Sequence, residues 1–182
     1  MALKATIFKC DLNVSDLNRH HYAQYPLTLA RHPSETDERM MLRIVAFALF
    51  ADEQLAFTKG LSAQDEPDLW LKNYAGETEL WLELGTPDEK RIRQACSKAK
   101  QVVILGYGGR TVDIWWQAME KQVQRFEHLQ VLNIDATQSK NLAALAEKSM
   151  DIQITIQDEQ VFISAGAENI SLDIQRLYGS AF

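Results

Sequence analysis

Apolar and polar residues alternate along the first part of the chain. Residues 2–14 and 20–30 are short stretches rich in β-branched and aromatic residues, and Asp16, Leu17 and Asn18 interrupt them. A strand sends successive side chains to opposite faces, so two such stretches joined by polar residues are typical of an antiparallel pair. The pattern predicts a β-hairpin at the start of the fold.

The spacing then changes to that of an amphipathic helix. Ser34 precedes this segment, and Asp37 follows three residues later, which resembles the start of a capped helix. A helix places residues three and four apart on one face. The apolar positions with this spacing are Met41, Ile44, Val45 and Ala48. We therefore predict a helix over about residues 35–52, with Ser34 as its N-cap.

The second half of the chain alternates buried-strand and helix patterns. After Gly85, Thr86 can cap a helix whose first position is Pro87 and whose capping box is completed by Glu89. The expected elements that follow are a strand over 101–108, a helix over 110–126, a strand over 128–136, a helix over 139–149 and a hairpin turning at 158–159. This order predicts one α/β domain over residues 1–182, with a mixed central sheet flanked by helices and with added β-hairpins.

Residues 67–85 place acidic side chains where a core strand would carry aliphatic ones. Two short apolar runs, 68–72 and 78–84, surround a turn that contains Gly76. If the turn is centred between residues 75 and 76, residues whose numbers add to 151 lie opposite each other. The expected pairs are Asp68 with Glu83, Trp70 with Trp81, and Lys72 with Glu79.

Opposed residues in such a pair have Cβ atoms roughly 4.5 to 5.5 Å apart, a distance from which two carboxylates can reach one small cation. Two like charges on a partly buried face raise one pKa, share a proton or bind a cation. Mg²⁺ prefers oxygen ligands and often takes only one or two protein carboxylates. Asp68 and Glu83 are therefore candidate ligands for Mg²⁺ or Mn²⁺. The alternative is a solvated edge, where both acids point at water and the tryptophans only pack.

Charge and composition restrict the classes of partner. The net charge of −6 argues against a general nucleic-acid coat, although a local basic cleft could still bind nucleic acid. The two cysteines cannot build a disulfide framework. The first residues contain no continuous apolar segment of signal-peptide length, and no apolar run approaches the length of a membrane span. We expect a cytoplasmic protein with no membrane contact. The sequence does not indicate an oligomeric state.

The acidic hairpin and its neighbours resemble a known superfamily. Pro67-Asp68 and Glu83-Leu84-Gly85 stand where the PD-(D/E)XK nucleases carry their two motifs, within a helix-strand-strand-strand-helix-strand order. The longer strings RHPSETDERMMLRIVAFAL, EPDLW and WLELGTPDEKRIRQAC look like the YaeQ family, whose fold is a variant of that superfamily. The resemblance implies a restriction-endonuclease-like αβββαβ core and a metal site in which Glu38 joins Asp68 and Glu83.

One position departs from the motif of an active nuclease, because Gly85 stands where lysine is expected. Lys90, Gln94 and Lys98 recur every four residues along the next helix, so Lys90 or Gln94 could reach back into the site, as in superfamily members with a migrated lysine. The alternative is an ordinary solvated face formed by Lys90, Arg91, Arg93 and Lys98. On the first helix, Arg39 and Arg43 could bind phosphate or pair with Glu35 and Asp37.

Two functions follow from these features. The first is a divalent-metal-dependent nuclease or phosphodiesterase of unknown substrate, with Asp68, Glu83 and Lys90 or Gln94 as catalytic residues. The second is a catalytically degenerate nuclease-fold protein that acts as a binding or regulatory module.

Gly106 and Gly108 match the first two glycines of a dinucleotide-binding G-x-G-x-x-G turn, but Thr111 stands where the third glycine is required. We therefore interpret the segment, which also contains Gly109, as a tight strand-to-helix turn.

Overall fold

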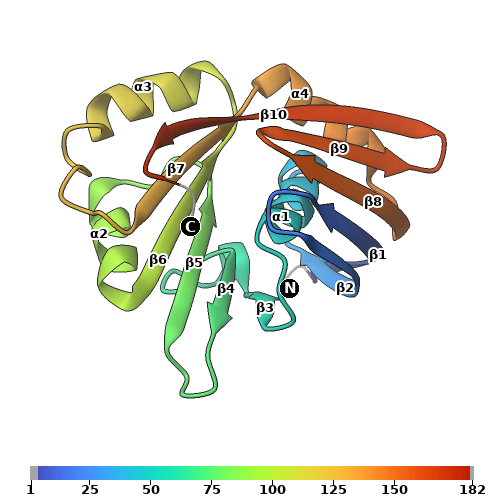
Figure 1. Ribbon diagram of the computed structural model, residues 1–182, viewed down its shortest axis with the longest axis horizontal. Helices are drawn as coiled ribbons and strands as arrows, with labels where there is room; N and C mark the ends of the chain where they lie inside the picture. Colours follow the sequence, from blue (N-terminus) through green and yellow to red (C-terminus); the bar gives the residue numbers. More distant parts are fainter. Residues whose placement is uncertain (1–3, 181–182) are drawn as a thin grey trace. The chain divides into compact units, whose positions relative to one another are not determined.

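The computed structural model describes residues 4–180, which form two compact units (Figure 1). The N-terminal unit contains residues up to 51 and residues 137–173, and the C-terminal unit contains residues 52–136 and those from 174 onward. Strand β10 (Glu168–Tyr178) contributes to both, because its first half pairs with β9 and its second half with β7. The prediction of one domain over residues 1–182 stays a prediction.

The N-terminal unit is a mixed sheet with a helix against it. Its strands follow the order β2-β1-β8-β9-β10, in which β1 and β8 are parallel and the other pairs antiparallel. The elements are β1 (Thr6–Asp16), β2 (His21–Arg31), α1 (Asp37–Leu49), the 3-10 helix η2 (Leu142–Leu145), β8 (Ser149–Gln157) and β9 (Gln160–Ala165), and α4 (Ala136–Asn141) begins at the boundary. The antiparallel pairing of β1 with β2 and of β8 with β9 confirms both predicted hairpins.

The C-terminal unit follows the strand order β10-β7-β6-β5-β4-β3, with β5, β6 and β7 parallel. The elements are β3 (Leu55–Phe57), the 3-10 helix η1 (Gly60–Ser62), β4 (Leu69–Lys72), β5 (Thr78–Leu84), α2 (Glu89–Lys98), β6 (Ala99–Gly106), α3 (Arg110–Met119) and β7 (Leu129–Ile134). The predicted α/β class with a mixed sheet is therefore confirmed.

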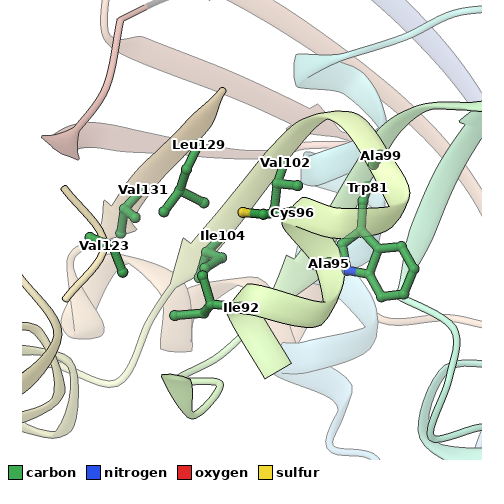
Figure 2. Close-up of a cluster of buried hydrophobic side chains, with 10 residues drawn as sticks. All are labelled: Trp81, Ile92, Ala95, Cys96, Ala99, Val102, Ile104, Val123, Leu129 and Val131. Carbon is green, nitrogen blue, oxygen red and sulfur yellow. The ribbon is translucent and has the colours of Figure 1, made fainter. Parts of the chain in front are cut away.

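One apolar cluster fixes α2 on the face of the sheet that carries Trp81 (Figure 2). Ile92, Ala95 and Cys96 of α2 pack against side chains of β5, β6 and β7. Cys96 is thus a core residue. Burial raises its pKa to about 11, which keeps the thiol protonated.

Both predicted N-caps are wrong. Helix α1 is capped by Thr36, whose Oγ1 accepts from the Arg39 N–H at 3.1 Å, whereas the Ser34 hydroxyl lies 2.6 Å from His32 Nδ1. Helix α2 is capped by Asp88, whose Oδ1 accepts from the Arg91 N–H at 2.8 Å, so Thr86 and Pro87 precede the helix. In each case a later oxygen satisfies the first free backbone N–H groups.

The pair Trp115 and Trp116 on α3 both pack against the core cluster and are both half-buried. The Trp115 Nε1–H donates to the carbonyl of Pro87 at 2.6 Å, which attaches α3 to the segment before α2. The helix starts at a glycine turn, because Gly108 and Gly109 adopt φ angles of +103° and +65°. This confirms the strand-to-helix interpretation of the glycine-rich segment.

Candidate functional site

The register of β4 and β5 determines which side chains share a face. Leu69 lies opposite Leu82, Trp70 opposite Trp81 and Leu71 opposite Leu80, so the predicted sum of 151 holds for these pairs. A register shift follows Leu71, and Lys72 therefore lies opposite Thr78. The predicted pair of Lys72 with Glu79 is wrong, because the extra residue of a β-bulge changes the pairing beyond it.

Asp68 lies directly before β4 and is almost completely buried, with 4% of its surface exposed. Its backbone N–H donates to the carbonyl of Leu82 at 3.1 Å. Its Oδ2 accepts from the Leu84 N–H at 2.8 Å. Asp68 is thus bonded to the two residues of β5 that flank Glu83.

Glu83 is half-buried on the same sheet face as Trp81. Burial raises the pKa of its carboxyl group above the ordinary value, the guanidinium of Arg91 acts in the opposite direction, and the charge of Asp68 raises it further. Burial is the largest of these effects, and the charge of Asp68 is a smaller one.

Arg91 supplies the positive charge beside Glu83, although its place in the sequence predicted only a solvated helix face. Its Nε donates to Glu83 Oε1 at 2.7 Å, and only 19% of its side chain is exposed. Two further donors reach the carbonyls of Gln64 and Glu66, in the connector before β4. The solvated-face alternative is therefore wrong for Arg91. Recognising Asp88 as the N-cap would have placed Arg91 in the first turn of α2, next to the end of β5.

The two auxiliary residues proposed from the sequence make no such contact. Lys90 is exposed, and Gln94 is half-buried on α2. Neither side chain has a hydrogen bond to Asp68 or Glu83 in the described residues. Their catalytic role stays a prediction.

The backbone explains why glycine stands at the third motif position. Gly85 follows β5 with a φ of +103°, a conformation that residues with a side chain adopt only under strain. Its N–H donates to the carbonyl of Leu105 at 2.9 Å, which fixes this conformation at the end of the parallel pair. A lysine at residue 85 would have space but would strain the backbone.

Glu38 belongs to the N-terminal unit, in the first turn of α1. There the Ser139 hydroxyl donates to its Oε1 at 3.1 Å. The neighbouring Glu35 is buried and accepts from Arg39 at 2.8 Å and from Arg43 at 2.6 Å. Arg39 and Arg43 thus form ion pairs with Glu35, which is the alternative to phosphate binding. Asp37, the other expected partner, pairs with Arg31. The role of Glu38 as a third ligand stays a prediction.

The donor chemistry of the acidic pair fits Mg²⁺ or Mn²⁺ only in part. Asp68 and Glu83 offer carboxylate oxygens, the ligand type that these ions prefer. However, Glu83 Oε1 already accepts from Arg91, and within residues 4–180 no three side chains of the histidine, cysteine, aspartate and glutamate types form a group that could hold a metal ion. Any additional ligands would have to come from water or from the substrate.

Comparison with known proteins decides the family. A family model described as YaeQ protein matches residues 1–174. The chain belongs to the YaeQ family. Two relatives, both described as uncharacterized protein YaeQ, come from Salmonella typhi and Escherichia coli strain K12. They are 47% and 46% identical over 174 residues, and each alignment covers 96% of both chains.

Two solved YaeQ structures share this fold along nearly the whole chain. The YaeQ protein from Xanthomonas axonopodis pv. citri aligns with a TM-score of 0.94 at 42% identity, covering 97% of this chain and 99% of that one. The YaeQ protein from Pseudomonas syringae aligns with a TM-score of 0.92 at 31% identity, covering 97% of each.

The structure also bears on the expected location. Among the helices of residues 4–180, none has both the length and the apolar composition that crossing a membrane requires. The cytoplasmic location and the nucleic-acid partner stay predictions for this YaeQ chain.

Proposed function

We propose that this YaeQ protein is a divalent-metal-dependent phosphodiester hydrolase, with Asp68 and Glu83 as metal ligands. One observation carries the proposal: Asp68 is hydrogen-bonded to Leu82 and Leu84, the two residues that flank Glu83, and its charge raises the pKa of Glu83. A buried acid next to a half-buried one is costly unless a cation accompanies them. Mg²⁺ or Mn²⁺ is the proposed cofactor, and water or the substrate would supply its remaining ligands.

The order of elements supports a nuclease-like fold. Helix α1 is followed by β3, β4 and β5 and then by α2 and β6, which reproduces the αβββαβ order of the PD-(D/E)XK superfamily. Asp68 directly precedes β4 and Glu83 lies near the end of β5, the positions that the two motifs of that superfamily require. We therefore propose a restriction-endonuclease-like core for this chain.

The residues of the site have separable roles in this proposal. Backbone hydrogen bonds hold Asp68 in position, while Glu83 contributes the second carboxylate. A bound Mg²⁺ would position water and stabilise the negative charge that develops on phosphorus. Lys90 or Gln94 would orient that water in place of the missing lysine, and a nucleic acid in a local cleft is the proposed substrate.

A cleavage assay tests the proposal. Purified protein is incubated with single- and double-stranded DNA and RNA in Mg²⁺, Mn²⁺ or EDTA. We expect cleavage that requires the metal and falls about 100-fold in Glu83→Gln. Glu79→Gln is the matched control, because Glu79 lies on the same strand but pairs with Lys100, and it should cleave normally. Cleavage that survives in EDTA or in Glu83→Gln would contradict the proposal.

A second function is favoured by the environment of the motif. Gly85 replaces the lysine at a position with positive φ, and Arg91 already neutralises Glu83. These features suit a catalytically degenerate nuclease-fold protein that acts as a binding or regulatory module. Absence of cleavage for every substrate, together with retained binding of an oligonucleotide, would favour this second function over the first.

A further inference from the structure

We propose that a groove of the C-terminal unit binds a nucleotide whose base carries an exocyclic amino group, with guanine preferred. The base stacks on Trp70, and its amino group donates to the acids of the connector, residues 63–67. The phosphate pairs with Lys72 and Lys98. Neither Asp68 nor Glu83 lines this groove, so the inference goes beyond the proposed metal centre and needs no metal.

The groove is lined by the connector, the β4–β5 hairpin, the end of α2 and the start of β6. Its volume of about 650 Å³ lies within the range of about 300 to 1,000 Å³ that is usual for small-molecule sites. The lining includes Asp65 and Glu66 from the connector, Trp70 and Lys72 from β4, and Lys98 from the last turn of α2. It therefore has space for a nucleotide and combines an aromatic ring with charges of both signs.

Trp70 supplies the aromatic surface that a base can reach. Trp81 lies opposite it on β5 but is only 1% exposed, whereas Trp70 is half-buried. The ammonium group of the exposed Lys72 lies over the Trp70 ring, 3.9 Å from its centroid. A lysine side chain is long and flexible, so it can leave the ring for a phosphate, and a base can then stack on the indole.

Two lysines of the groove lack an acidic partner. Within the part of the chain that the structure describes, neither Lys72 nor Lys98 forms an ion pair with a carboxylate. The third lysine of the lining, Lys100, lies 3.3 Å from Glu77 and 2.7 Å from Glu79, so its charge is compensated. Lys72 and Lys98 are therefore the cations that remain for a phosphate group.

Two acids give the groove its selectivity. Asp65 is exposed and has no hydrogen bond or ion pair among the described residues, and Glu66 uses Oε2 to accept from the Lys59 N–H at 3.2 Å. Carboxylates only accept hydrogen bonds, so they repel a phosphate and favour a group with N–H donors. Guanine presents a ring N–H and an amino group side by side, which match the two oxygens of one carboxylate. Charges of both signs thus fit a nucleotide better than a simple anion.

The turn of the hairpin is fixed before any ligand binds. Gly76 and Glu77 of this turn also line the groove. The side-chain oxygen of Asn73 accepts from the Ala75 N–H at 2.9 Å and from the Glu77 N–H at 3.0 Å. A preformed site loses less conformational freedom on binding, which favours affinity.

Titration calorimetry in EDTA tests the acids with two ligands, guanosine monophosphate (GMP) and inosine monophosphate (IMP), which lacks only the exocyclic amino group. We expect GMP to bind about 10-fold more tightly than IMP, because IMP leaves a carboxylate oxygen without its donor. The double variant Asp65→Asn/Glu66→Gln should bind both nucleotides equally. Equal affinity of wild type for GMP and IMP overturns the role of the acids, and absence of binding for both overturns the site.

Variants test the other contacts. Trp70→Leu should weaken GMP binding at least about 10-fold through lost stacking, whereas Trp70→Phe should keep most of it. Lys72→Gln and Lys98→Gln should each weaken it about 3- to 10-fold, and by less at high salt; they decide the matter if Trp70→Leu does not fold. Arg93→Gln is the matched control, because Arg93 lies on α2 outside the lining and pairs with Glu89. The same loss in Arg93→Gln as in the lysine variants would reduce the effect to net charge and overturn the site.

A short single-stranded oligonucleotide that contains guanine separates the two sources of such a ligand. Tighter binding than that of GMP assigns the groove to a strand, and equal binding assigns it to a free nucleotide. The outcomes also separate this inference from the proposed hydrolase. Absence of nucleotide binding in EDTA overturns the groove alone, and absence of metal-dependent cleavage with nucleotide binding retained overturns the hydrolase alone.

Discussion

Single residues in this chain have conformations that only certain side chains permit. Gly179 follows β10 with a φ of +85°, and a Cβ at this position would lie 2.4 Å from the carbonyl oxygen of Leu129. Gly76 has a similar φ of +84°, but nothing lies within 4 Å of its Cβ position. Comparing substitutions at these two glycines therefore separates the energy of backbone strain from that of steric overlap.

We predict that Gly179→Ala lowers the free energy of unfolding by about 2 to 4 kcal/mol, from left-handed strain plus overlap with the neighbouring strand. Gly76→Ala should cost only the strain, about 1 to 2 kcal/mol. Urea denaturation followed by circular dichroism measures both. Equal losses in the two variants would show that the contact with Leu129 has no energetic weight.

Gly85 adopts a backbone conformation that residues with a side chain rarely take. Gly85→Lys introduces the lysine that the proposed likeness to the PD-(D/E)XK nucleases calls for, but it places a side chain at a φ of +103°. We expect a loss of about 1 to 3 kcal/mol in unfolding free energy. Lysine accommodated there without loss of stability, measured by urea denaturation, would contradict the backbone explanation for glycine.

Element boundaries show how far the sequence determines this fold. The hairpins, the parallel strands and the helices were predicted in order, because their hydrophobic periodicity reflects burial. Two helix bounds were wrong: α3 ends at Met119 and not at residue 126, and the helix predicted over 139–149 is α4 (Ala136–Asn141) followed by η2 (Leu142–Leu145). The caps were missed, since Ser34 and Thr86 resemble Thr36 and Asp88 in sequence and differ only in which oxygen reaches a backbone N–H.

The same limit applies to the candidate site. Asp68 and Glu83 were found because opposed acids stand out in a strand pattern, and their register is correct up to Leu71. The bulge at Lys72 and the pairing of Arg91 with Glu83 depend on tertiary contacts between β5, α2 and the connector. No local pattern in the sequence encodes those contacts.

The cap of α1 can be tested directly. Thr36→Ala removes the acceptor for the Arg39 N–H and should lower the free energy of unfolding by about 1 kcal/mol. Ser34→Ala removes the hydroxyl that the sequence suggested as the cap and should change stability by less than about 0.5 kcal/mol. A larger loss in Ser34→Ala than in Thr36→Ala, measured by thermal unfolding, would reverse this assignment.

The hairpin of β4 and β5 carries an exposed charge cluster with a defined pH dependence. Hydrogen bonds from Asn73 and Lys100 lower the pKa of Glu77, and those from Lys100 and Asn73 lower the pKa of Glu79. A carboxyl group with a lowered folded-state pKa stabilises the fold above its ordinary pKa. This contribution disappears as the pH falls through the lowered value.

Lys100→Met should therefore reduce stability at pH 7, and the difference from wild type should shrink as the pH falls toward about 3. Lys98→Met is the control, because Lys98 has no carboxylate partner among the described ion pairs. Urea denaturation at both pH values measures the effect. A difference from wild type that is the same at pH 7 and at acid pH would contradict the assigned cause.

At the scale of the whole molecule, the two compact units each contain one buried cysteine. Burial raises the pKa of Cys10 to about 12, with the charges of Asp11 and Asp151 adding to it, and burial raises that of Cys96 to about 11. Because the thiolate is the reactive form, both thiols should be inert in the native state. Each can report separately on the unfolding of its own unit.

We predict that Ellman's reagent at pH 8 labels neither Cys10 nor Cys96 in native protein. The variants Cys96→Ser and Cys10→Ser isolate the two signals during urea denaturation. The same urea midpoint for both thiols is expected if the chain unfolds as the single domain that the sequence predicts. Two separate midpoints would show that the two units unfold independently.

The proposed function depends most on Asp68 and Glu83 binding one cation together. Titration calorimetry with Mn²⁺ measures this directly on wild type, Asp68→Asn, Glu83→Gln and the control Glu79→Gln. One Mn²⁺ per chain should bind to wild type and to the control, with affinity lowered about 10- to 100-fold by either substitution at the acidic pair. Binding that is unchanged in both Asp68→Asn and Glu83→Gln would contradict the shared metal site.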